Sequence, residues 1–239
     1  MNKYHAQYHI SRYFLHIFIF MLPCLVVTQS IVAQTDKSAI SSGNTFLDEK
    51  AQRKFDYYFF EGLNAKTQEK YAEAFDFFRH CYAIDSTNAN VLVELGTFYN
   101  VLDEKSRALD LYKKAVSYDP ENFYYNMLLA ALSKEMGQKQ QVIDVLEFLL
   151  QKYPEKIDLN MQLAQAYADN GELKKAISAL NNLEKAVGIT DNITLYKFQL
   201  YSMLNQKEKA FKEIEQIINE NPGDPRYLIL MGDLYMQDD

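Results

Sequence analysis

Tryptophan is absent from this chain of 239 residues, and proline, glycine, histidine and cysteine are scarce. Five prolines and eight glycines suit a mostly helical chain, because both residues interrupt helices. Of the two cysteines, Cys24 lies in an apolar N-terminal segment. If that segment is removed, Cys81 is alone and no internal disulfide can form. The length is enough for one large domain or a short repeat array.

A concentration of positive charge is also missing. The formal net charge is −7, and residues 34–239 alone carry 23 basic and 32 acidic residues. No dense cluster of lysine and arginine follows residue 33. Because binding to phosphates needs a basic stripe, the sequence indicates that nucleic acid is not a partner.

Patterns that carry catalysis or bind metals are lacking as well. Three of the four histidines precede residue 33, so a processed chain would hold only His80, next to Cys81. A single histidine supplies neither a Ser-His-Asp arrangement nor a histidine-rich zinc site. No glycine-rich phosphate loop is present, and the acidic pairs fall at expected helix starts or at the chain end. We therefore predict a chain that is not an enzyme and has no cofactor or metal.

Residues 1–33 have the order of features that is typical of a secretory signal peptide. Basic residues precede an apolar run at residues 13–28, and the small residue Ala33 follows. The ending Ala33-Gln34 is similar to that of many exported bacterial chains of the Bacteroidetes type. We predict cleavage after Ala33 and a protein that is located in the periplasm or is associated with the outer membrane.

Two other interpretations of this segment stay open. The stretch 13–33 nearly reaches the roughly 20 residues that span a bilayer, so it could remain as an inner-membrane anchor. Cys24 could instead be lipidated, although the residue before it, Pro23, is not small. Residues 34–54 then begin as a polar tether and include the start of the first helix, near Asp48.

From Phe55 onward, the sequence repeats itself every 34 residues without a gap. We number the repeats 1 to 6 and the positions within each repeat as places 1 to 34. Five repeats are complete and the sixth stops after 15 residues. They cover residues 55–88, 89–122, 123–156, 157–190, 191–224 and 225–239.

Several places keep one kind of residue. Small residues dominate place 8, which holds Gly62, Gly96, Ala130, Ala164, Phe198 and Gly232. They also dominate place 20, with Ala74, Ala108, Val142, Ala176 and Ala210. Place 24 is large, with Phe78, Tyr112, Leu146, Leu180 and Ile214. Place 15 is mostly a turn former, with Glu69, Asp103, Gly137, Gly171 and Asn205. Each repeat is therefore predicted to be a helix hairpin with closely packed helices, which must stack on the next hairpin to bury its apolar face.

This pattern resembles the tetratricopeptide repeat (TPR) family over residues 55–239. The resemblance implies an all-α solenoid, in which antiparallel helix hairpins stack into a right-handed superhelix. Repeat 5 departs from the pattern at Lys197 and Phe198, and repeat 1 departs at Glu61. We expect the helices there to sit slightly apart.

In that family, the first helix of each hairpin lines a concave groove through places 2, 5, 9, 12 and 13. The resemblance implies a peptide-binding groove at Phe59, Leu63, Val93, Thr97, Asn100, Met127, Ala131, Met161, Gln165, Leu195, Gln199 and Ile229. Place 5 is apolar in all six repeats and lacks the lysine of the members that bind chaperone tails. An extended or helical peptide with apolar anchors is therefore expected. Packing of place 5 against neighbouring helices is the competing interpretation.

The leading hypothesis for function is a scaffold that binds a protein or peptide outside the cytoplasm. A structural subunit of an envelope or secretion complex is one alternative, and an accessory segment of a larger enzyme or sensor is another. Residues 225–239 reproduce a first helix that is too apolar for one buried stripe. We therefore expect either further repeats after Asp239 or self-association through this end.

Export is expected to remove residues 1–33, because the basic start, the apolar run and Ala33 occur in the order that signal peptidases recognise. Intact-mass analysis of the protein from its native host checks this prediction. A mass that still includes the apolar run would contradict cleavage and would support a membrane anchor.

Overall fold

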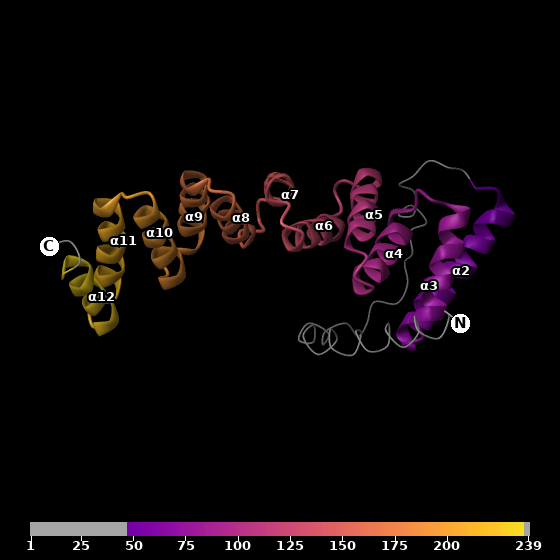
Figure 1. Cartoon of the computed structure of the whole chain (residues 1–239), viewed down its shortest axis with the longest axis horizontal. Coiled ribbons are helices and arrows are strands. Elements are labelled where there is room, and N and C mark those ends of the chain that lie inside the picture. Colours follow the sequence, from indigo (N-terminus) through magenta and orange to yellow (C-terminus); the bar gives the residue numbers. More distant parts are fainter. Residues whose placement is uncertain (1–46, 237–239) are drawn as a thin grey trace. The chain divides into compact units, whose positions relative to one another are not determined.

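The computed structural model describes residues 47–236, and this range contains eleven helices and no strand (Figure 1). The first helices of the hairpins are α2 (Glu49–Thr67), α4 (Ala89–Val101), α6 (Phe123–Glu135), α8 (Leu159–Asp169), α10 (Asp191–Met203) and α12 (Pro225–Met236). The second helices are α3 (Tyr71–Ile84), α5 (Lys105–Tyr118), α7 (Lys139–Lys152), α9 (Leu173–Val187) and α11 (Lys207–Glu220). The predicted signal peptide lies outside the described residues. None of the described helices is both long and apolar enough to cross a membrane.

The helices belong to two compact units, whose boundary falls after Leu132, inside α6. In the first unit, α2 packs on α3, α3 on α4 and α4 on α5. In the second unit, each helix from α7 to α12 packs on the next one in the chain. Packing in chain order is what a stack of helix hairpins requires, because each hairpin covers the apolar face of its neighbour.

The turn between the two helices of each complete repeat is a left-handed residue at place 15. The φ angle is 61° at Glu69, 62° at Asp103, 70° at Gly137, 82° at Gly171 and 55° at Asn205. The turns predicted at this place are therefore confirmed. Glycine, aspartate and asparagine tolerate this conformation, whereas glutamate gains nothing from it and bears the steric cost of its Cβ.

The two helices of a hairpin meet where place 8 faces place 24. A Cβ added to Gly62 would lie 3.0 Å from the Phe78 ring, and one added to Gly96 would lie 2.6 Å from the Tyr112 ring. Both rings are buried, with 0% and 2% of their surface exposed. The small residues predicted at place 8 are therefore required in these two repeats, because the ring of the second helix occupies the space of a side chain.

A cation stacks on a tyrosine in three hairpins, always from place 19 onto place 11. The charged group lies 4.2 Å from the ring centroid for Arg107 on Tyr99, 5.2 Å for Lys175 on Tyr167 and 5.7 Å for Lys209 on Tyr201. Repeats 1 and 3 have no tyrosine at place 11 and no cation at place 19. The two places therefore vary together along the chain, as expected for residues in direct contact.

The unusual Lys197 of repeat 5 is buried and paired, with only 3% of its surface exposed. Its ammonium lies 3.0 Å from a carboxylate oxygen of Glu184 on α9 and 2.9 Å from one of Glu213 on α11. Burial alone would lower the pKa of Lys197, but its hydrogen bonds to the two carboxylates outweigh this effect and raise it. Burial raises the pKa of Glu213, and Lys197 only partly opposes that shift. A charged cluster thus replaces apolar packing between α9, α10 and α11.

Helix α12 has one covered side and one open side. Tyr227 is buried and its hydroxyl donates to Asp191 on α10, which ties repeat 6 to repeat 5. Leu228 and Ile229 are exposed, and a Cβ on Gly232 would meet nothing within 4 Å. The described residues thus include no helix packed on Gly232 as α3 is packed on Gly62. The expectation that further repeats or a second copy cover α12 stays a prediction.

Replacing Glu69 with glycine is expected to raise the free energy of unfolding by about 1 kcal/mol, because the left-handed conformation costs a side chain with a Cβ about 1–2 kcal/mol and glycine loses more entropy on folding. Urea denaturation followed by circular dichroism measures the change. Gly171→Glu is the matched control and should lower stability. An unchanged midpoint for both variants would show that place 15 is not under this constraint in solution.

Lys197→Leu is expected to lower the free energy of unfolding by about 3–5 kcal/mol at pH 7, because it leaves the buried carboxylate of Glu213 without its partner. The folded-state pKa of Glu213, already raised by burial, then rises further. A carboxyl group with a raised folded-state pKa costs stability fully above that pKa, and the cost declines as the pH falls from the folded pKa to the lower, unfolded pKa. The deficit of Lys197→Leu should therefore shrink as the pH is lowered from 7 towards 5.

The double variant Lys197→Leu/Glu213→Leu is the control for this prediction. It copies repeat 2, which has Leu95 and Leu111 at the same two places. Thermal unfolding at several pH values should show that it recovers most of the lost stability and has little pH dependence. A double variant as unstable as the single one would contradict a dominant role for the unpaired charge.

Candidate binding surfaces

The predicted groove residues of the first unit differ widely in exposure. Phe59, Leu63, Thr97, Asn100 and Met127 are half-buried, and Ala131 is exposed. Val93 is the exception, since only 5% of its surface is exposed. Because α4 has packed helices on either side, Val93 belongs to the core and offers almost no surface to a partner.

Polar groups on the same helices are already engaged with one another. The Thr97 hydroxyl donates to the Val93 carbonyl at 2.9 Å and lies 3.2 Å from the Tyr112 hydroxyl. Lys66 at place 12 pairs with Glu94 at 2.6 Å, from repeat 1 to repeat 2. The ion pair neutralises Lys66, so an acidic ligand would have to displace Glu94. Glu94 was not predicted as a site residue, because it stands at place 6, outside the places expected to line the groove.

The second unit presents its predicted groove residues more openly. Met161 and Leu195 are half-buried, whereas Gln165 and Gln199 are exposed, and 62% of the surface of Ile229 is accessible. The Gln165 amide donates to Asp169 at 3.0 Å on the same helix. These side chains therefore offer a mixed apolar and neutral polar surface, without an exposed cation among them.

Large exposed apolar side chains mark the first helices. At expected groove places stand Tyr124, Met203, Ile229 and Met236, which are 59%, 67%, 62% and 72% exposed. On the second helices of the described residues, large apolar side chains are exposed only at the last residue of α5 and of α9, Tyr118 and Val187. The first helices thus offer more exposed apolar side chains to a partner than the second helices do.

The side chains of His80 and Cys81 lie in different surroundings. His80 is exposed and its ring stacks on Tyr58 with 4.8 Å between centroids. Cys81 is fully buried, and burial raises the pKa of its thiol to about 12, so the thiol stays protonated at neutral pH. Within residues 47–236, no three His, Cys, Asp or Glu side chains are grouped as metal ligands.

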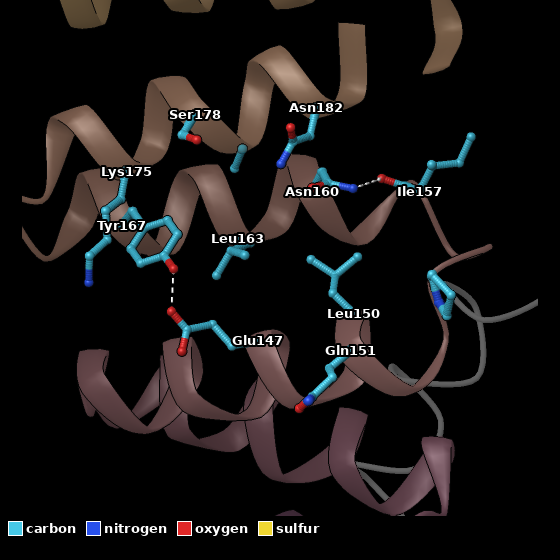
Figure 2. A pocket seen from close by; sticks show the side chains of 12 residues that line it. Glu147, Leu150, Gln151, Ile157, Asn160, Leu163, Tyr167, Lys175, Ser178 and Asn182 are labelled. Carbon is cyan, nitrogen blue, oxygen red and sulfur yellow. Dashed lines mark hydrogen bonds between the residues drawn. The ribbon is translucent and has the colours of Figure 1, made fainter. Parts of the chain in front are cut away.

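A cleft of about 550 Å³ lies between the second helices α7 and α9, with the first helix α8 as its floor (Figure 2). At one end, the Tyr167 hydroxyl donates to Glu147 and Lys175 stacks on the Tyr167 ring. Burial raises the pKa of Tyr167, and the bond to Glu147 raises it further, so the hydroxyl remains a donor. Sequence reasoning missed this cleft, because the expected groove lies on the first helices alone.

The repeats match known sequence and structural patterns. Residues 65–132 match one sequence model described as a tetratricopeptide repeat, and residues 157–190 match another. A search of curated protein sequences gave no match.

Solved structures share the arrangement of helices at low sequence identity. The crystal structure of MamA protein has a TM-score of 0.58 and 19% identity, over 74% of this chain and 96% of MamA. YrrB, described as a TPR protein with an unusual peptide-binding site, has a TM-score of 0.58 and 17% identity, over 76% and 97%. A MamA fragment from Desulfovibrio magneticus RS-1 has a TM-score of 0.54 and 16% identity, over 77% and 99%. Residues 65–132 and 157–190 therefore match tetratricopeptide repeats in sequence, and the fold of the chain is an all-α solenoid of the kind that tetratricopeptide-repeat proteins adopt.

Proposed function

We propose that this chain is a non-catalytic scaffold that holds a protein or peptide on the surface of its first helices. The observation that carries the proposal is the exposure of Tyr124, Met203, Ile229 and Met236 at places where a groove is expected. Apolar side chains that stay accessible to water gain free energy when a partner covers them, at about 25 cal/mol per Å². Within the described residues, the second helices have no comparable set of exposed apolar side chains, apart from Tyr118 and Val187 at helix ends.

The chemistry of this surface favours a ligand with apolar anchors. Methionines at Met127, Met161, Met203 and Met236 are flexible and adapt to different apolar side chains, so moderate specificity is expected. Gln165 and Gln199 add neutral hydrogen-bonding groups. The description of YrrB as having a peptide-binding site is consistent with a peptide partner for this fold.

Export places this scaffold outside the cytoplasm in our proposal, in the periplasm or at the outer membrane. The support is the pattern of residues 1–33 and its similarity to exported chains of the Bacteroidetes type. The formal charge of residues 34–239, with 23 basic and 32 acidic residues, makes nucleic acid or an acidic membrane surface an unfavourable partner.

The double variant Met127→Glu/Met161→Glu is expected to lower affinity for the native partner at least about tenfold, because carboxylates would have to be desolvated under the ligand. The partner is identified by affinity purification from the native host and is then titrated by calorimetry. Ser106→Glu/Gln216→Glu is the matched control, since it adds the same charge at exposed positions of second helices.

Circular dichroism should show unchanged helicity for both double variants. Equal affinity of Met127→Glu/Met161→Glu and the wild-type protein would move the binding surface away from the first helices. Loss of affinity in the control variant would instead indicate a general effect of charge.

A further inference from the structure

The cleft between α7 and α9 exists because one side chain is small. Place 23 of repeat 4 is Ala179, whereas the other repeats have Phe77, Leu111, Val145 and Glu213 at that place. Ala179 is part of the cleft lining, together with Leu163 at place 7 and Leu150 at place 28. A larger side chain at place 23 would extend into this space.

The next junction shows how the chain fills the same space. There, places 28, 7 and 23 are Glu184, Lys197 and Glu213, which form the buried charged cluster. The side chain of Lys197 reaches both carboxylates and closes the gap between the helices. The three equivalent residues in the cleft are leucine, leucine and alanine, so the middle of the cleft is apolar and lacks a side chain that spans it.

The walls of the cleft also carry neutral polar groups around this apolar middle. Figure 2 shows Ser178 and Asn182 on α9 and Gln151 on α7, on opposite sides of Leu150 and Leu163. Within the described residues, no hydrogen bond engages the side chains of Ser178, Asn182 and Gln151. Amide side chains both donate and accept hydrogen bonds, as do the N–H and C=O groups of a peptide main chain.

We propose that this cleft is a second binding site, which takes a short extended peptide segment of a partner protein through one aliphatic side chain. The aliphatic side chain of the peptide lies above Ala179, between Leu150 and Leu163. There it fills the space that a leucine at place 23, such as Leu111 in repeat 2, would fill. The main chain on both sides of it bonds to Asn182 and Gln151. The volume of about 550 Å³ is in the range of ligand sites, about 300–1,000 Å³.

The position of the charged residues in the cleft lining favours a ligand whose inserted side chain is uncharged. Glu147 and Lys175 are the two ionised side chains of the cleft, and they lie at one end, where both contact Tyr167. Lys175 pairs with Glu172 at 2.5 Å, and Glu147 accepts a hydrogen bond from Tyr167, so both charged groups are engaged at that end. The middle of the cleft therefore favours an aliphatic side chain over a charged one, because nothing there would offset the loss of hydration of an ion.

Fluorescence anisotropy of the full chain with a labelled Gly-Ser-Gly-Leu-Gly-Ser-Gly peptide tests the site. Saturable binding is expected for this probe, and at least about tenfold weaker binding for the same peptide with glycine or aspartate in place of leucine. Absence of saturable binding, or equal binding of the three peptides, would overturn the proposal.

Ala179→Leu is the decisive variant, because it fills the cleft with the residue that repeat 2 already has. It should weaken binding of the leucine probe at least about tenfold while the melting temperature stays the same or rises. Ala186→Leu on the same helix is the matched control and should bind normally, since Ala186 is exposed and outside the cleft. Wild-type affinity in Ala179→Leu would overturn the proposal.

Two further variants keep the test decisive if Ala179→Leu is unstable. Ser178→Trp covers the cleft from its exposed wall, and Gln151→Ala/Asn182→Ala removes the amides, so each should weaken the leucine probe severalfold. Unchanged affinity in both would contradict the site. Met127→Glu/Met161→Glu should bind the leucine probe like the wild-type protein, which separates this site from the first-helix surface.

Discussion

The contact between a small residue at place 8 and a large side chain at place 24 holds the hairpins together. At Gly96 even a methyl group would lie 2.6 Å from the Tyr112 ring, so the two helices approach as closely as their backbones and one ring allow. This approach fixes which side of each first helix is covered by its own second helix. The remaining sides of the first helix face the neighbouring repeats or solvent. The candidate binding surfaces are the sides that face solvent.

Local features of the hairpins could be predicted from the sequence because they depend on residues close together in the chain. The turn at place 15 needs a left-handed residue, and the alternation of small and large residues at places 8, 20 and 24 marks two packed helices. Even the poor turn former Glu69 follows the pattern, since the geometry of the whole hairpin determines its conformation. Tertiary context here overrides the preference of a single residue.

Interactions between repeats could not be predicted in the same way. Lys197 and Phe198 stood out as departures, and slightly separated helices were the expected consequence. The structure instead buries Lys197 between two carboxylates of different helices. The tyrosine–cation pairs at places 11 and 19, which lie within single hairpins, were not predicted from the sequence either.

The candidate sites show the same limit. The place within a repeat indicates the helix face, yet exposure at place 5 ranges from 5% at Val93 to 62% at Ile229, because the number of neighbouring helices differs. The cleft beside Ala179 results from an absent side chain, and a single alanine in an amphipathic helix gives no signal of a cavity. Such a site is found only when equivalent places of several repeats are compared in three dimensions.

The charged cluster around Lys197 also affects how the second unit deforms. Hydrogen-bonded ions lose their interaction when the donor and acceptor directions change. A rotation of repeat 5 against repeat 4 would lengthen the contact of Lys197 with Glu184, so this ion pair restricts the relative orientation of the two repeats. The twist of the solenoid at this junction is therefore coupled to the ionisation of buried side chains.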